Sequence, residues 1–224
     1  MALSSLFRRR TGASRPDPRD LPLRLIDRHA PGHTFFDVGC MWKIHGGYAF
    51  RAADAGAVRV VGVDVMAATP EFLARNAARA RPIEFVQADV NDPALPARVG
   101  RADVVFCGGV LYHVPNPVLT LERLRALATG TLILSSMTIP ERDLPQAAVY
   151  VPFLPDAGRR TLAARVAGPS KIGLDTPFDA AVDYSNWFWL LTPSAIAAML
   201  RTAGFAVLES HVFRHAACFV CAVA

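Results

Sequence analysis

Three aspartates stand where three short apolar segments of the chain end. Asp37 follows residues 34–36, Asp64 follows the β-branched segment 58–63, and Asp89 follows 83–88. They are spaced 27 and 25 residues apart, about one strand-plus-helix unit each time. Ligands of an open parallel sheet bind outside the carboxyl ends of its strands, so the three carboxylates are predicted to line one cleft. A single acid at such a position is often a helix N-cap, but that alternative does not account for three in succession.

Each of these positions suits one part of S-adenosylmethionine. Asp37 is expected to face the ammonium group, directly or through water, while Gly39 lets the backbone approach the ligand because glycine has no Cβ. Asp64 is expected to accept hydrogen bonds from the ribose hydroxyls. Asp89 is expected to accept from the adenine amino group while the backbone of Val90 contacts the ring edge. The other predicted cofactor-binding residues are Cys40, Met41, Val65 and Gly108.

A sulfonium methyl group is already electrophilic, so the protein mainly has to align a nucleophile and exclude water. His113, just beyond the fourth apolar segment, is the first candidate for a general base toward a hydroxyl or amine acceptor. The alternative is a structural histidine bonded to backbone. Tyr112 is expected to position the methyl group or the acceptor, and Tyr184 is the third predicted catalytic residue. The aromatic segment 184–189 is interpreted equally well as a roof over the acceptor pocket and as core.

An alternation of strands and helices is needed to position these residues. Strands are expected at 34–36, 58–63, 83–88, 103–107, 131–135, 205–209 and 216–223. Helices are expected at 21–30, 48–55, 70–80, 117–127 and 193–202, with Thr69 and Thr192 as N-caps before proline. The predicted fold class is α/β: a Rossmann-like doubly wound seven-stranded sheet, mostly parallel with an antiparallel last strand, and helices on both faces.

The chain is predicted to hold a flexible basic arm at 1–20 and a single domain at 21–224. The five arginines of the arm favour a solvated terminus over a phosphate-binding segment, because no aromatic residues interleave them. An insertion at about 140–186 is rich in Pro, Asp and Gly, with a weak helical period at 157–167. Such an insertion inside an ordered domain is typical of a lid or acceptor-binding segment.

The composition excludes several classes of protein. Hydrophobic residues make up 52% and charged residues 19% of the 224 residues, which is typical of a globular chain. No apolar run is long enough to span a bilayer, so no membrane partner and a cytoplasmic location are expected. Cys218 and Cys221 have metal-ligand spacing but lie in a predicted strand, and are expected to be buried thiols on opposite faces. The pair His211 and His215 predicts a hairpin rather than a metal site.

The chain resembles the class I S-adenosylmethionine-dependent methyltransferases. The segments that carry the resemblance are DVGC at 37–40, VVGVDV ending at Val65, GGVLYHVPNP at 108–117, LERLRAL at 121–127 and the stretch 186–205. Within this family the chain is similar to the branch of the bacterial enzymes that carboxymethylate the wobble uridine of tRNA. The resemblance covers about residues 35–208 and implies a bacterial methyltransferase (a transferase of class EC 2.1.1) that uses S-adenosylmethionine and releases S-adenosylhomocysteine.

The sequence also departs from the family pattern. Where many members have further glycines after DxG, this chain has Met41, Trp42 and Lys43, which predicts a different loop path and a cation near the cofactor's carboxylate. The tRNA enzymes carry an additional N-terminal region, and cationic partners for a carboxylated cofactor cannot be placed here. These departures favour O- or N-methylation of a small metabolite, with nucleic acid as a disfavoured but open substrate and the oligomeric state open.

Two other classes of function remain as alternatives. A nicotinamide-dependent oxidoreductase is disfavoured, because DVGCMWKIHGG follows the first strand in place of G-x-G-x-x-G. A non-catalytic protein that keeps the cofactor site stays open because of the altered loop at 41–43.

Overall fold

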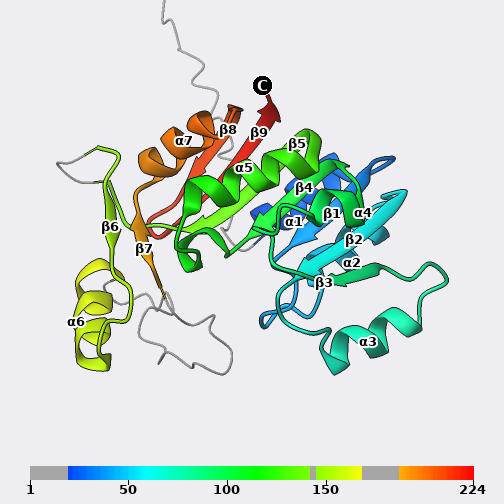
Figure 1. Cartoon of the computed structure of the whole chain (residues 1–224), viewed down its shortest axis with the longest axis horizontal. Helices are drawn as coiled ribbons and strands as arrows, with labels where there is room; N and C mark the ends of the chain where they lie inside the picture. Colours follow the sequence, from blue (N-terminus) through cyan, green and yellow to red (C-terminus); the bar gives the residue numbers. More distant parts are fainter. Residues whose placement is uncertain (1–19, 142–144, 168–186) are drawn as a thin grey trace, which may run out of the picture.

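The computed structural model describes residues 20–141, 145–167 and 187–224. Its centre is a seven-stranded sheet in the order β3-β2-β1-β4-β5-β9-β8 (Figure 1). The strands are β1 Thr34–Val38, β2 Arg59–Asp64, β3 Glu84–Gln87, β4 Ala102–Gly108, β5 Ala128–Met137, β8 Phe205–Val212 and β9 Ala216–Val223. β1 to β5 run parallel, while β9 is antiparallel to both β5 and β8. The predicted fold class, including the antiparallel last strand, is confirmed.

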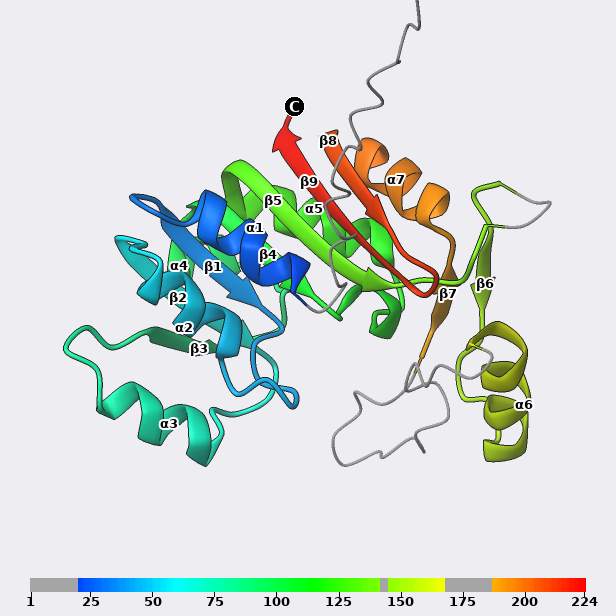
Figure 2. The same ribbon diagram turned by 180° about the vertical axis from the view of Figure 1, so that it is seen from behind.

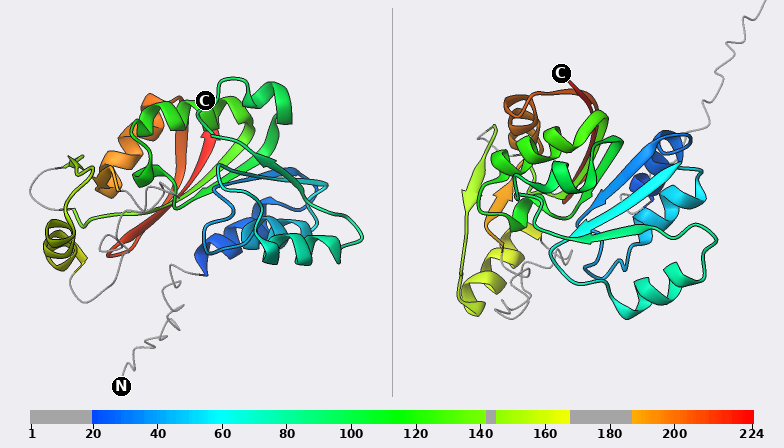
Figure 3. Two further views of the ribbon diagram at one scale, coloured as in Figure 1. Left: turned by 60° about the horizontal axis from the view of Figure 1, so that its bottom comes forward. Right: turned by 45° about the vertical axis from the view of Figure 1, so that its right-hand side comes forward.

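Helices cover both faces of the sheet, as Figures 1 and 2 show from opposite sides and Figure 3 shows edge-on. One face carries α1 Leu21–His29, α2 Gly47–Asp54 and α3 Pro70–Ala77, and the other carries α4 Leu95–Val99, α5 Pro117–Leu127 and α7 Pro193–Thr202. Successive strand residues point to opposite faces. Phe35 accordingly packs under α1 and α2 and Phe36 under the α5 side, both fully buried.

Helix starts are fixed by the side-chain caps that the sequence predicts. Thr69 Oγ1 accepts a hydrogen bond from Phe72 N at 3.2 Å, and Thr192 Oγ1 accepts from Ala195 N at 3.3 Å. Both caps precede a proline at the first helical turn, where a missing N–H costs nothing. The caps at Thr69 and Thr192 are therefore confirmed.

The predicted insertion contains regular structure of its own. β6 Ala148–Tyr150 pairs antiparallel with β7 Trp189–Leu191 in a separate two-stranded sheet, and α6 Asp156–Ala167 follows β6. In Figure 1 these elements form a small lobe beside the end of β5. Ile139 N donates to Leu191 O at 3.0 Å, which ties the lobe to the chain that leaves β5. The helix at 157–167 is confirmed, but the sequence did not reveal β6, β7 or α4.

The two residues of the CxxC pair lie on opposite sides of the sheet. Cys218 belongs to the core beneath α1 and α2, and Cys221 to the core beneath α5 and α7. Burial raises the pKa of each thiol to about 12, so both are structural thiols as predicted. His211 Nε2 lies 3.0 Å from Glu209 Oε2. The described part of the chain holds no cluster of three metal-binding side chains and no helix able to cross a membrane.

Candidate active site

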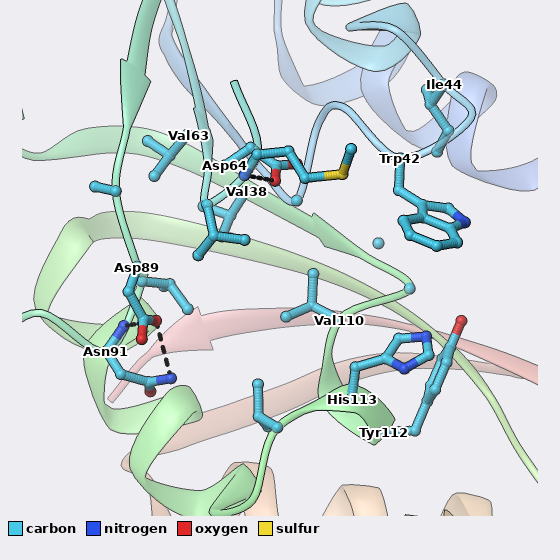
Figure 4. Close-up of a pocket in the computed structure, with 18 of the residues that line it drawn as sticks. Val38, Trp42, Ile44, Val63, Asp64, Asp89, Asn91, Val110, Tyr112 and His113 are labelled. Atoms are coloured by element: carbon cyan, nitrogen blue, oxygen red, sulfur yellow. Dashed lines mark hydrogen bonds between the residues drawn. The ribbon is translucent and has the colours of Figure 1, made fainter. Parts of the chain in front are cut away.

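A cavity of about 530 Å³ opens at the carboxyl ends of β1, β2, β3 and β4. The strand ends and the segments that follow them provide most of its wall, and residues next to β7 complete it. Figure 4 shows the aspartates on one side of this cavity and aromatic rings on the other. The position agrees with the rule that ligands of an open parallel sheet bind beyond the carboxyl ends of its strands.

Asp64, the last residue of β2, is held in the cavity wall by backbone hydrogen bonds to both of its carboxylate oxygens. Its Oδ2 accepts a hydrogen bond from Met41 N at 2.7 Å, and its Oδ1 accepts from Met66 N at 2.8 Å. Burial raises the pKa of this carboxyl, and hydrogen bonds from the backbone of Met66, Met41 and Val65 counteract that rise. The side chain lines the cavity with only 7% of the residue exposed. Both oxygens keep further lone pairs for ligand hydroxyl groups.

Asp37 lies behind the cavity wall rather than in it. Its Oδ2 accepts from Ala49 N at 2.9 Å in the first turn of α2, whereas its Oδ1 has no hydrogen-bond partner among the described residues. Burial raises the pKa of this carboxyl to about 7, the Ala49 hydrogen bond lowers it, and the nearby charge of Asp64 raises it further. Because the cavity lining does not include Asp37, the direct contact expected from the sequence is not supported. Contact through water remains the prediction.

The loop after β1 turns sharply at Gly39, a predicted cofactor-binding residue that lines the cavity. Its φ is +82°, and a Cβ there would lie 2.3 Å from Val110 Cγ2. Glycine is therefore required both by the backbone conformation and by the close approach of the segment after β4. Cys40 and Met41 are fully buried in the α1–α2 core and do not line the cavity, which corrects the prediction for their side chains. The turn at Gly39 directs both side chains under α2.

The next residues return to the cavity. Trp42, Lys43 and Ile44 line it, and the Lys43 ammonium lies 5.7 Å from the centroid of the Trp42 ring. Lys43 and His45 have φ of 56° and 49°, in the left-handed region that residues other than glycine seldom adopt. Lys43 is exposed and is the one Lys or Arg among the described residues that line the cavity.

The far end of the cavity is formed by the turn after β3. Asp89 Oδ1 accepts hydrogen bonds from Asn91 N at 2.8 Å and from Asn91 Nδ2 at 3.2 Å (Figure 4). Val90 is 7% exposed, and Val110 faces this region from the segment after β4. Asp89, Val90, Val65 and Gly108, which the sequence predicts to bind the cofactor, all line the cavity.

The other end of the cavity is aromatic. Tyr112 and His113 belong to the 3₁₀ turn η1 Leu111–His113, and in Figure 4 they lie across the cavity from Trp42. The Tyr112 ring stacks on Trp187 at 4.2 Å between centroids, and the His113 ring lies 4.3 Å from that of Tyr112. Burial raises the pKa of the Tyr112 hydroxyl well above its ordinary value. Phe188 N donates to Tyr112 O at 3.0 Å, which joins the segment before β7 to η1.

Comparison with known proteins identifies a methyltransferase domain in part of the chain. Residues 36–134 match the sequence model of a family described as a methyltransferase domain. This match, the relative described next and the solved structures together support a class I S-adenosylmethionine-dependent methyltransferase. One relative of the chain, the tRNA U34 carboxymethyltransferase of Alcanivorax borkumensis, is 34% identical over 112 residues, which are 48% of this chain and 33% of that protein. The matched part thus spans about a third of the length of that relative.

Solved structures with the same fold cover more of this chain. The magnesium protoporphyrin IX methyltransferase of Synechocystis superposes with a TM-score of 0.58 and 18% identity, over 92% of this chain and 77% of that one. The 1,6-didemethyltoxoflavin-N1-methyltransferase of Burkholderia thailandensis superposes with a TM-score of 0.63 and 16% identity, over 92% and 78%. At these identities the superpositions establish the fold.

Several cavity residues were not identified from the sequence. They include Trp42, Ile44, Met66, Asn91 and Val110. The spacing Asp89-x-Asn91 is typical of an Asx turn, so the sequence carries a signal for Asn91. Trp187, interpreted from the sequence equally as roof and as core, is 5% exposed, packs in a small buried cluster with Tyr112, and lines the cavity. Tyr184 lies outside the described residues.

Proposed function

We propose that this chain transfers the methyl group of S-adenosylmethionine to an oxygen or nitrogen atom of a small, ring-bearing molecule. The observation that carries the proposal is the division of the cavity into an acidic half at β2 and β3 and an aromatic half at η1 and β7. The acidic half suits a cofactor with hydroxyl, amino and ammonium donors. The aromatic half suits a flat apolar acceptor.

The described residues in the acidic half of the cavity fit the cofactor. Asp64 is held by two backbone amides with lone pairs left for the ribose hydroxyls, and Val90 and Val110 offer apolar surface to the adenine ring. The orphaned Oδ1 of Asp37 supplies a buried acceptor for a water that reaches the ammonium group. Lys43, the one Lys or Arg among the described cavity residues, is the cation available to pair with the cofactor's carboxylate.

Bound in this half, the cofactor supplies an electrophilic sulfonium methyl group. The chain then has to hold an acceptor atom in line with that group and keep water out. The stacked Tyr112–Trp187 pair offers a flat, rigid wall for the acceptor ring. His113, beside Tyr112, is in position to take the proton that a hydroxyl or amine acceptor releases.

A tRNA substrate is the second candidate, because the curated relatives that match about half of this chain are tRNA carboxymethyltransferases. Affinity for nucleic acid comes mainly from cations that neutralise phosphates. Among the described residues that line the cavity, Lys43 alone is Lys or Arg. The cavity therefore favours the small-molecule acceptor.

The test is methyl transfer from S-adenosylmethionine labelled in its methyl group. Parallel reactions contain a panel of phenols, anilines and N-heteroaromatic compounds, or bulk tRNA. The proposal predicts label in at least one small aromatic compound and none in tRNA above the no-enzyme level. Label in tRNA alone would establish the second candidate, and no label in either from protein that binds the cofactor would support a non-catalytic role.

A further inference from the structure

A chain of hydrogen bonds runs from the buried side of α5 to the far end of the cavity. Thr120 Oγ1 donates to Asn91 Oδ1 at 2.9 Å, and Asn91 Nδ2 donates to Asp89 Oδ1 at 3.2 Å. Asn91 N donates to the same Asp89 oxygen at 2.8 Å. Asp89 and Asn91 both line the cavity, whereas Thr120 is fully buried in the core beneath α5. The chain therefore connects a fixed interior hydroxyl to an exposed acid of the site.

The orientation of the Asn91 amide follows from its two partners. An ionised carboxylate can only accept hydrogen bonds, so the Asn91 NH₂ group must face Asp89. The Asn91 carbonyl must then face Thr120, whose hydroxyl supplies the proton. That hydroxyl also lies 3.2 Å from Asn116 O one turn back in α5, a longer contact that anchors Thr120 to its helix. A reversed amide would place two acceptors together at Asp89.

This arrangement gives the two carboxylate oxygens of Asp89 different roles. Oδ1 receives both hydrogen bonds from Asn91, and Oδ2 accepts no hydrogen bond from the described ranges 20–141, 145–167 and 187–224, so it is left to accept from a ligand. A free exposed carboxylate would rotate about its side-chain torsions and lose that direction. A carboxylate oxygen held in place distinguishes a ring bearing an amino donor from one bearing a carbonyl acceptor.

We propose that Asn91 is a positioning residue that fixes the Asp89 carboxylate for recognition of the adenine 6-amino group, and that the hydroxyl of Thr120 fixes Asn91. The inference rests on the proposed binding of the adenosyl cofactor and adds to it the residues that give the site its selectivity for adenine. Neither Asn91 nor Thr120 touches the reacting methyl group in this account.

The test uses two probes that differ at one position of the base, S-adenosylhomocysteine and S-inosylhomocysteine, in which a 6-oxo group replaces the 6-amino group. Their dissociation constants are measured by calorimetry for the wild type, Asn91→Ala, Thr120→Val and Thr120→Ser. The wild type is expected to prefer the adenosyl compound by at least about 10-fold, as for a hydrogen bond to a charged group. Asn91→Ala is expected to reduce that preference by roughly 3- to 10-fold. Thr120→Val is expected to reduce the preference for the adenosyl compound as well. Thr120→Ser keeps the hydroxyl and is expected to retain the wild-type preference.

Asp92→Asn is the matched control, because Asp92 lies in the same turn, caps Ala94 N at 2.8 Å and does not line the cavity. Its adenosyl preference is expected to equal that of the wild type. A general loosening of the turn would weaken both probes equally and leave the ratio unchanged, which would overturn the inference. Thr120→Val provides the measurement if Asn91→Ala does not fold. A wild type that binds neither probe would instead refute the proposed function.

Discussion

The carboxylate of Asp64 accepts a hydrogen bond from the backbone amide of Met41 at 2.7 Å, so the end of β2 and the loop after β1 are held as one unit. Met41 itself points into the core and is fully buried. The loop that follows, with Trp42 and Lys43 on the cavity wall, is thereby anchored where it begins. The altered loop sequence is thus compatible with an ordered cofactor site.

Gly39→Ala is expected to weaken cofactor binding and to destabilise the fold. The new Cβ would lie 2.3 Å from Val110 Cγ2, and the φ of +82° strains any residue other than glycine. Gly32→Ala is the matched control, since Gly32 has a φ of +75° and a Cβ there would meet no atom within 4 Å. We expect Gly39→Ala to cost at least about 1 kcal/mol more unfolding free energy than Gly32→Ala, measured by urea denaturation. Equal losses of unfolding free energy in the two variants would show that Val110 moves aside without destabilising the fold.

Asp37→Asn is expected to make the ligand-free protein less sensitive to pH. Burial raises the folded-state pKa of Asp37 to about 7 from an ordinary value of 3.8. A raised pKa means that the stabilising contribution is complete below about pH 4 and is lost as the pH rises through about 7. The wild type is therefore expected to lose roughly 2–4 kcal/mol between pH 4 and pH 8 through this group alone.

Asparagine keeps an oxygen to accept from Ala49 N and does not ionise. The measurement is thermal melting of both proteins from pH 4 to pH 8 without ligand. The difference in melting temperature is expected to move in favour of Asp37→Asn as the pH rises. A difference that stays constant across this range would contradict the buried, titrating carboxyl.

His113→Gln is expected to lower kcat by about 100-fold or more on the acceptor identified by the methyl-transfer screen, because the proton acceptor is lost. The affinity for S-adenosylhomocysteine should stay within about 2-fold, well under the effect of one hydrogen bond. His33→Gln serves as the control, since His33 is exposed before β1 and bonds to Pro31 O. If kcat of His113→Gln matches that of the control, His113 is not the base.

Trp187→Leu is expected to raise the KM for the aromatic acceptor by roughly 3- to 10-fold and to leave cofactor affinity unchanged. The reason is loss of the flat wall that Trp187 forms with Tyr112, whose ring centroid lies 4.2 Å away. Trp189→Leu is the matched control: Trp189 packs against Tyr150 at 4.8 Å between ring centroids and lies outside the cavity lining. Steady-state kinetics with varied acceptor separate the two variants. An unchanged KM in Trp187→Leu would place the acceptor elsewhere.

The sheet and its helices were predictable because their signals are local. Each strand is a short apolar run. The N-caps Thr69 and Thr192, each followed by proline, mark the starts of α3 and α7 in the sequence. β6 and β7 have no such signal: each has three residues, and the partners are about 40 positions apart in the sequence. Their pairing depends on tertiary contacts that local patterns do not carry.

The site was predictable at the strand ends and less so between them. Asp64 and Asp89 line the cavity because strand ends of a parallel sheet meet at one edge. Cys40 and Met41 were misplaced because the side-chain directions after Gly39 depend on its positive φ, which the sequence permits but does not specify. Asn91 went unnoticed because its role depends on Thr120, which belongs to a different element.

The most direct test of the account is calorimetric titration of the purified protein with S-adenosylmethionine and S-adenosylhomocysteine, repeated on Asp64→Asn. Asp54→Asn is the control, because Asp54 is a surface acid that pairs with Arg79 outside the cavity. Micromolar dissociation constants (about 10⁻⁶ M) are expected for the wild type and the control. Asp64→Asn is expected to lose at least about 10-fold in affinity. No binding by wild-type protein shown to be folded, or equal binding by Asp64→Asn, would contradict the assignment of this cavity to the cofactor.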